Sequence, residues 1–258
     1  MRNVFALANQ KGGVAKTTTA INLSACLAEL GKKVLLIDMD PQGNATSGLG
    51  VDRQELEHCI YDVLIAGAPL EAVILPSQIP GLSLAPATIN LAGAEVELVA
   101  ELERESRLKQ ALQPVKDRYD YVIVDCPPSL GLLTLNALSA ADGILSPVQC
   151  EYYALEGLGQ LLNTFQAVKK NLNPELEIAG VLMTMFDSRT NLSIQVVDEV
   201  KAYFGNQVFA SLIPRNIRLA EAPSHGLAIR QYDQRSRGSE AYAKLTQEFL
   251  DRQQQKEA

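Results

Sequence analysis

The segment Asn9-Gln10-Lys11-Gly12-Gly13-Val14-Ala15-Lys16-Thr17-Thr18-Thr19 decides the fold of this 258-residue chain. An apolar stretch typical of a strand precedes it, and a stretch with helical spacing follows it. Its two glycines let the backbone turn with N–H groups facing inward, Lys16 adds a positive charge, and Thr17 opens the helix. These features predict a loop that binds the phosphates of a nucleotide. The residues expected around the phosphates are Lys11, Gly12, Gly13, Val14, Ala15, Lys16, Thr17 and Thr18.

The loop departs from the strict phosphate-loop pattern at two positions. Ala15 stands where a glycine usually precedes the lysine, and Gln10 stands where the leading glycine is usual. With a positive φ at Ala15, the methyl group would cost about 1–2 kcal/mol and would weaken nucleotide binding. We predict a negative φ, because the other charged residues of the expected site are all present.

Strands and helices alternate along the chain, and this order predicts an α/β fold with a doubly wound, mostly parallel sheet flanked by helices. The run Val34–Ile37 is continuously apolar, as expected for a strand covered on both faces. The expected strands are 4–8, 33–38, 82–86, 121–125, 144–148, 178–183 and 208–213. The expected helices are 17–30, 54–66, 91–116, 132–141, 155–170, 193–204 and 239–252.

Composition narrows the class of protein. With 47% hydrophobic residues, the chain can bury a core as one domain spanning 1–258. We find no apolar run of about 18 residues and no signal peptide, so we expect a cytoplasmic protein. The net charge of −7 argues against a monomer that coats DNA. One local exception is the stretch Ser211–Gly238, where five arginines and two acidic residues give +3.

Carboxylates follow two of the predicted strands, at the edge where open α/β sheets bind ligands. Asp125 ends an apolar strand, an arrangement that holds Mg²⁺ directly or, as we favour here, through water, and the Thr17 hydroxyl is a second expected ligand. Asp38 and Asp40 follow another strand. We favour Asp40 for positioning the water that attacks the γ-phosphate, with Mg²⁺ ligation as a further possibility; a turn-forming role before Pro41 is the competing interpretation.

The chain resembles the ParA/Soj chromosome-partitioning ATPases of the deviant Walker A class, which also contains the MinD and nitrogenase iron protein relatives. The resemblance covers nearly the whole length. It is carried by Lys11-Gly-Gly-x-x-Lys16-Thr17, LLIDMDPQGNATSGLG at 35–50, DCPPSLG at 125–131, PVQCEYYALEG at 147–157 and IPRNIRLAEAPSHG at 213–226.

This resemblance implies a P-loop ATPase that uses ATP with Mg²⁺ and assigns roles to single residues. Lys11 would reach across a sandwich homodimer to the ATP of the other subunit, and Lys16 would act within its own subunit. Pro214 and Asn216 would contact adenine, and Arg189 and Arg218 would bind double-stranded DNA without sequence preference. The implied partners are a ParB/Spo0J-like centromere-binding protein that stimulates slow hydrolysis and a replication initiator. The protein would associate with the nucleoid.

Two other functions stay open at this point. A MinD-like positioning ATPase would need a C-terminal amphipathic membrane helix, whereas residues 251–258 are polar and nearly neutral, so we expect no membrane partner. A nucleotide-binding regulator that does not hydrolyse ATP is the third interpretation.

Overall fold

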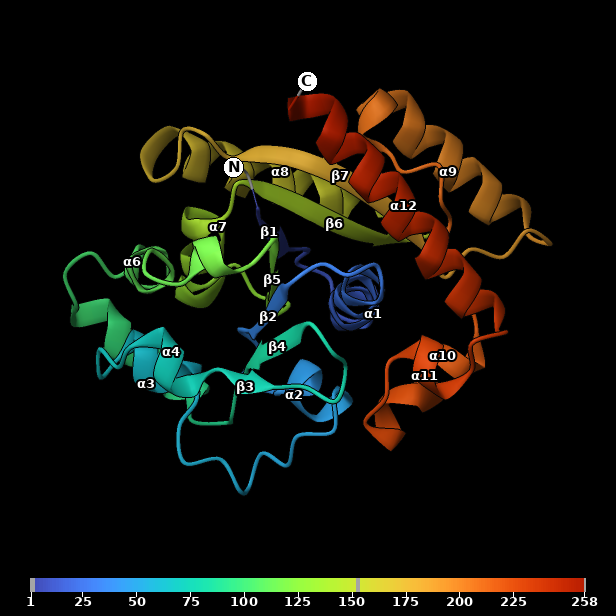
Figure 1. Cartoon of the computed structure of the whole chain (residues 1–258). Coiled ribbons are helices and arrows are strands. Elements are labelled where there is room, and N and C mark those ends of the chain that lie inside the picture. Colours follow the sequence, from blue (N-terminus) through green and yellow to red (C-terminus); the bar gives the residue numbers. More distant parts are fainter. Residues whose placement is uncertain (1–2, 152–153, 258) are drawn as a thin grey trace.

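A seven-stranded sheet forms the centre of the molecule (Figure 1). The computed structural model describes residues 3–151 and 154–257. The strand order is β3-β4-β2-β5-β1-β6-β7, and all neighbouring strands are parallel except the β3–β4 pair. The strands are β1 Val4–Leu7, β2 Val34–Asp38, β3 Leu75–Pro76, β4 Leu82–Ala85, β5 Tyr121–Asp125, β6 Gly143–Gln149 and β7 Glu177–Thr184. The expected doubly wound, mostly parallel sheet is confirmed.

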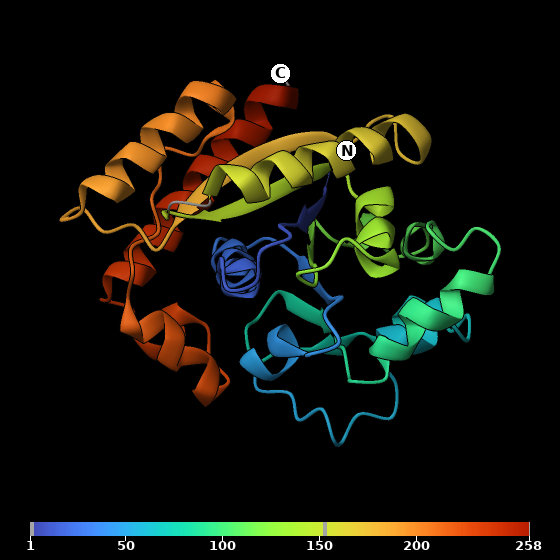
Figure 2. The ribbon, with the colours of Figure 1, turned by 180° about the vertical axis from the view of Figure 1, so that it is seen from behind.

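Helices cover both faces of the sheet (Figures 1 and 2). The longer helices are α1 Lys16–Glu29, α7 Leu132–Ala140, α8 Ala154–Asn171, α9 Asn191–Phe204 and α12 Arg237–Glu257. The shorter ones are α2 Asn44–Gly48, α3 Ile60–Leu64, α4 Leu70–Val73, α5 Leu91–Glu97, α6 Arg107–Leu112, α10 Ile217–Glu221 and α11 Ile229–Tyr232.

Alternating side chains of each central strand enter two different cores, because successive residues of a strand point to opposite faces. In β2, Val34 and Leu36 pack with α1 and α12, whereas Leu35 and Ile37 pack with α3, α5, α6 and α7. A third cluster fills the space between α9 and the outer strands β6 and β7. Burial on both faces explains why β2 is apolar throughout.

The predicted strand 208–213 is wrong. Only isolated bridges form there, between Val208 and Val181 and between Pro214 and Phe186. The backbone N–H groups of Ala210 and Ser211 instead donate to the Glu248 carboxylate of α12, at 2.8 and 2.9 Å. A side chain therefore satisfies the backbone groups that a strand neighbour would otherwise pair.

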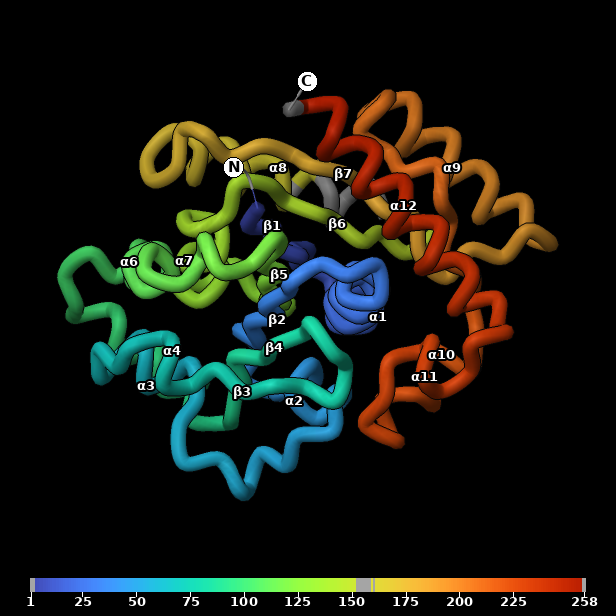
Figure 3. Tube along the Cα trace, viewed as in Figure 1, coloured from blue at the N-terminus to red at the C-terminus, as the bar shows by residue number. Residues whose placement is uncertain are grey.

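Two predicted helices are much shorter than expected. The 54–66 segment contains only α3, and the chain before it runs as an exposed loop (Figure 3). The 91–116 segment is broken into α5, a 3-10 turn at Leu98–Ala100 and α6. Glu103 has a φ of 53° in the break, which an α-helix does not tolerate. Sequence spacing also missed β3, α2, α4, α10 and α11.

Candidate functional site

The phosphate-loop segment connects the end of β1 to the start of α1, as predicted. Gly12 and Gly13 are exposed, and Gly13 has a φ of 75°, which favours glycine. Lys16 is buried, and its Nζ donates to the carbonyl oxygen of Lys11 at 3.1 Å. Burial lowers the pKa of Lys16, while the negative charges of Asp125 and Asp40 act in the opposite direction. The hydrogen bond to Lys11 therefore keeps the positive charge of Lys16 within the phosphate loop.

The prediction of a negative φ at Ala15 is wrong. Ala15 has φ 70° and ψ 33°, in the left-handed region. The residue directly precedes α1, and its carbonyl oxygen already accepts the first helical bond from Thr19 N at 2.9 Å. The turn that brings the chain into the helix needs the conformation that glycine adopts without strain. Ala15 adopts it at a cost of about 1–2 kcal/mol.

Two side-chain hydrogen bonds fix the phosphate loop to the ends of neighbouring strands. Asn9 Nδ2 donates to the Pro147 carbonyl oxygen of β6 at 2.8 Å, and Asn9 Oδ1 accepts from Lys11 N at 3.0 Å. The Thr184 hydroxyl, at the end of β7, donates to the Val14 carbonyl oxygen at 3.1 Å. The path of the loop is therefore set by three strands and not by its own sequence alone.

Asp38 and Asp125 occupy paired positions at the ends of β2 and β5, and both are fully buried. The Asp38 carboxylate accepts hydrogen bonds from Thr46 N, at 2.9 Å, from the Thr46 hydroxyl, at 2.7 Å, and from Asp40 N, at 3.1 Å. Burial nevertheless raises the pKa of Asp38 to about 6. Burial, followed by the charge of Asp38, raises the pKa of Asp125 well above its ordinary value.

The Asp125 carboxylate is suited to be a ligand of Mg²⁺. Both of its oxygens are buried and accept no hydrogen bond within the described residues, although the Thr17 hydroxyl is near enough to lower the pKa. A buried carboxylate without a partner is costly, and a cation is the partner that would offset this cost. No group of three or more acidic, histidine or cysteine side chains in the described chain is arranged to hold a metal. Mg²⁺ commonly takes one or two carboxylates and completes its shell with substrate phosphates and water.

Asp40 lies close to this cluster but also has a structural role. It is buried, and its Oδ1 accepts a hydrogen bond from Gln42 N at 2.9 Å, which closes the turn before α2. The turn-forming interpretation is thus compatible with the geometry. The second carboxylate oxygen of Asp40 is the one that would position the attacking water, and this role stays a prediction.

Lys11 behaves differently from Lys16. Its Nζ forms an ion pair with Glu151, which follows the end of β6, and about a third of each side chain is exposed. The Lys11 side chain is therefore partly exposed and directed toward Glu151, whereas the Lys16 side chain is buried in the loop. Sequence reasoning did not single out Glu151, because 140 positions separate it from Lys11.

Pro214 and Asn216 lie in the loop that follows the irregular 208–213 segment. Pro214 pairs with Phe186, just beyond the end of β7, and β7 also contacts the phosphate loop through Thr184. Asn216 caps α10, since its Oδ1 accepts from Arg218 N at 2.8 Å. The fold brings this loop to the same edge of the sheet as the phosphate loop; contact with adenine stays a prediction.

Both predicted DNA-binding arginines are exposed, and both are paired with acidic residues. Arg189 forms a two-pronged pair with Asp187, with N–O distances of 2.9 and 2.7 Å. Arg218 pairs with Glu221 at 2.8 Å and with Asp233 at 3.5 Å. Exposed pairs of this kind are weak, so a phosphate can displace the acidic partner.

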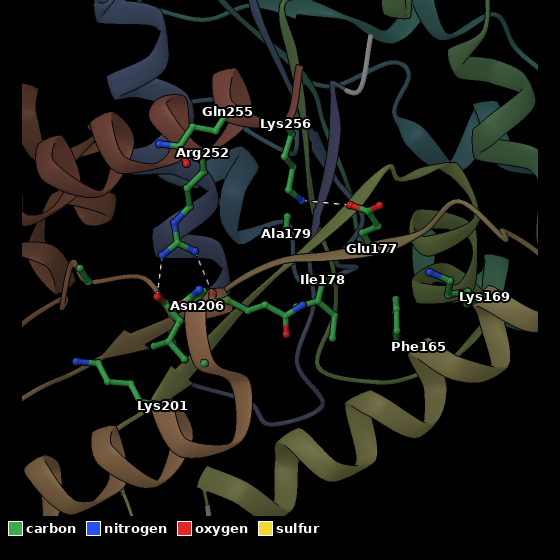
Figure 4. Close-up of a pocket in the computed structure, with 14 residues that line it drawn as sticks. Phe165, Lys169, Glu177, Ile178, Ala179, Lys201, Asn206, Arg252, Gln255 and Lys256 are labelled. Carbon is green, nitrogen blue, oxygen red and sulfur yellow. Dashed lines mark hydrogen bonds and ion pairs between the residues drawn. The ribbon is translucent and has the colours of Figure 1, made fainter. Parts of the chain in front are cut away.

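An open groove of about 1100 Å³ lies between the outer strand β7 and the ends of α8, α9 and α12 (Figure 4). Arg252 is held there by the carbonyl oxygens of Gln207 and Val208, and Lys256 pairs with Glu177 at 3.2 Å. Glu177 begins β7, whereas the phosphate loop lies where the parallel strands end. The groove is therefore separate from the predicted nucleotide site.

Comparisons with known proteins agree with this geometry. The AAA_31 family model, described as an AAA domain, matches residues 2–178. The chain is 60% identical to the sporulation initiation inhibitor protein Soj of Bacillus subtilis over 96% of this chain and 98% of that protein. It is 54% identical to the chromosome partitioning protein ParA of Myxococcus xanthus, over 96% and 88% respectively.

Solved structures share the fold. A Mycobacterium smegmatis protein described as cobyrinic acid a,c-diamide synthase, with bound ADP and magnesium, is 40% identical. It superposes with a TM-score of 0.86 over 98% of this chain and 96% of that one. The different names of these relatives illustrate that one fold supports several activities, so the activity must be argued from the site.

Proposed function

Because the chain belongs to the Soj/ParA family of chromosome-partitioning ATPases, we propose that it is an ATP-dependent dimerisation switch for DNA segregation. ATP binding would close two subunits into a sandwich homodimer. The dimer would bind DNA without sequence preference, and slow hydrolysis, stimulated by a ParB/Spo0J-like partner, would release it. A replication initiator is a further proposed partner, and the nucleoid is the proposed location.

The different placement of two lysines carries this proposal. Lys16 is buried at the loop and suits the phosphates of its own subunit, whereas Lys11 is partly exposed and held by Glu151. The phosphates of its own subunit do not need a second lysine on the surface side, because Lys16 already supplies that charge. Lys11 suits the nucleotide of a neighbouring copy, where it would supply the charge that an arginine finger supplies in other NTPases.

The remaining residues divide the chemistry among them. Gly12, Gly13 and the start of α1 would bind the phosphates through backbone N–H groups. The Thr17 hydroxyl and Asp125 would hold Mg²⁺, with Asp125 acting directly or through water. Mg²⁺, when bound, would neutralise negative charge on the phosphate oxygens. Asp40 would position the attacking water.

Retention of DNA tests the switch directly. Binding to random-sequence duplex DNA is measured with ATP, ADP and no nucleotide at several salt concentrations. We expect strong retention only with ATP. Arg218→Ala should lower the salt dependence of the dimer by about 2, since each phosphate contact contributes about 0.9 and two subunits contribute. Arg118→Ala, far from this surface and paired with Glu71, is the matched control. Equal retention in all three nucleotide states would exclude the switch.

The two competing functions have their own tests. A MinD-like protein needs a free apolar helix face, but Tyr242, Leu245 and Phe249 of α12 are buried against the sheet. No helix in the described ranges is long and apolar enough to span a bilayer. Sedimentation with liposomes and ATP tests membrane binding. Release of phosphate in the presence of DNA and partner separates a hydrolysing switch from a regulator that only binds nucleotide.

A further inference from the structure

An exposed apolar row begins just before α5 and continues along it into the segment that follows. Ile89 is 65% exposed, Val96 75%, Val99 59% and Leu102 87%. These four belong to only nine large hydrophobic residues that are exposed in the described chain. Single exposed apolar residues are ordinary, but a concentrated group of them marks an interaction surface.

The helical spacing separates this row from the core. Leu91, Ala94 and Leu98 occupy one side and are fully buried. Val96 and Val99 lie on the opposite side, three positions apart, so their side chains are neighbours on the helix surface. Val96 is 75% exposed and Val99 59%, so truncating these outward-facing residues should disturb the core little.

Helix α5 itself contacts the start of α7. Glu95 of α5 accepts a hydrogen bond from Leu133 N, in the first turn of α7, at 3.3 Å. A side chain at Gly131 would collide with the Glu95 carboxylate, which shows how closely α5 meets this turn. The turn follows the segment that begins at Asp125. A molecule bound on α5 would therefore lie on a helix that contacts the turn between Asp125 and α7.

The rim of the row is acidic. Glu97, Glu101 and Glu103 are exposed, and the sequence contains no lysine or arginine from 89 to 103. Glu101 pairs with Arg107 at 2.5 Å. Glu97 accepts from the Tyr61 hydroxyl at 3.1 Å and Glu103 from a glutamine amide at 2.6 Å, so neither charge is neutralised within the described residues.

This combination of charge and apolar area selects one class of partner. Nucleic acids and anionic lipid surfaces are repelled by the acidic rim. A second copy placed on this face by two-fold symmetry would bring two acidic rims together, which is unfavourable. A helix with apolar residues on one face and lysine or arginine on the other matches both the row and its rim.

We propose that Ile89, Val96, Val99 and Leu102, the α5 surface, form a docking site for a cationic amphipathic helix of another protein. The apolar face of that helix lies on the row, and its basic residues face Glu97 and Glu103. The site exists in the single chain, so it does not depend on the proposed ATP-driven dimer.

Binding of a defined peptide tests the α5 surface. The probe is a fluorescein-labelled 18-residue synthetic helix with leucine on one face and lysine on the other, titrated with the full chain without nucleotide. We expect saturable binding that the double variant Val96→Ser/Leu102→Ser weakens at least tenfold. The control Leu192→Ser/Ile194→Ser changes apolar residues of α9 that are each 44% exposed, and should leave the affinity within twofold. Thermal melts confirm that both variants fold.

A second variant tests the charge, and a cross-link tests the location. Glu97→Gln/Glu103→Gln should weaken binding at low salt and reduce its salt dependence, while a photo-reactive residue placed at position 99, but not at 194, should cross-link the probe. Absence of binding, or equal loss with the α9 control, would overturn the proposal. So would altered self-association of the α5 variant in sedimentation velocity with unchanged peptide affinity, because a second copy would then be the occupant. Light scattering with ATP reports separately on the proposed dimer.

Discussion

Lys11 and Glu151 form an ion pair within one chain, although 140 positions separate them. The pair joins the start of the phosphate loop to the segment that follows β6. If Lys11 has to reach a neighbouring subunit, this pair must open first. Glu151 would therefore oppose dimerisation and set how much ATP-bound chain stays monomeric.

Glu151→Gln should favour the ATP-bound dimer. Exposed ion pairs contribute about 0.2–1 kcal/mol, so losing this one should strengthen dimerisation by up to about fivefold per subunit. Light scattering at several protein concentrations with ATP measures the change. Glu71→Gln, which breaks the remote pair with Arg118, is the control, and Lys11→Ala should abolish the dimer. Unchanged or weaker dimerisation of the Glu151 variant would show that the pair does not restrain Lys11.

Removal of Mg²⁺ should reduce the thermal stabilisation by ATP, and this effect should depend on Asp125. Ligand that binds only the folded state stabilises it by about 2.7 kcal/mol at 100 times its Kd. We expect ATP with Mg²⁺ to raise the Tm more than ATP with EDTA, and Asp125→Asn to lose most of that difference. Without Mg²⁺, the two proteins should respond equally to ATP. If Mg²⁺ raised the Tm by the same amount in the native chain and in Asp125→Asn, residues other than Asp125 would bind the ion.

Most of the strands and the phosphate loop could be predicted because their signals are local. The apolar run of β2 and the glycine pair before Lys16 each report on a few adjacent residues. The partners of the site could not be predicted in this way. Glu151 pairs with Lys11, and Glu248 accepts a hydrogen bond from Ala210 N in the segment where a strand was expected. Both contacts join residues that are far apart in the chain. Spacing along the sequence carries no information on such contacts.

Ala15 illustrates a different limit. Its φ follows from how the loop enters α1 while neighbouring strands hold it through Asn9 and Thr184. The residue type alone favours a negative φ, and tertiary structure overrides this preference. The exposure of Val99 and Leu102 in the α5 surface likewise accompanies the break in the predicted helix 91–116.

Burial of Asp38 should make stability depend on pH. Its pKa is about 6 in the folded chain against 3.8 for an ordinary aspartate. A raised carboxyl pKa stabilises the folded state fully below the unfolded value, and this contribution is lost as the pH rises through the folded value. The contribution of Asp38 to the unfolding free energy should therefore fall between about pH 4 and pH 7.

Comparison of variants isolates this effect from other carboxylates. Urea unfolding of the nucleotide-free protein is followed from pH 4.5 to 7.5 for the native chain and for Asp38→Asn. The difference in unfolding free energy between them should move in favour of the variant as the pH rises. Asp251→Asn, an exposed change on α12, is the control. A difference that stays constant with pH would mean that Asp38 titrates normally.

Ala15→Gly should stabilise the protein, because glycine adopts a φ of 70° without strain. Relief of the left-handed strain contributes about 1–2 kcal/mol. The greater freedom of glycine in the unfolded chain offsets about 0.4–1 kcal/mol of this. We expect a net gain of about 0.5–1 kcal/mol in urea unfolding, with ATP binding retained or strengthened. Gly13→Ala, which places a methyl group at a φ of 75°, is the reciprocal control and should destabilise. A loss of stability in A15G would show that surrounding contacts of the methyl group outweigh the strain.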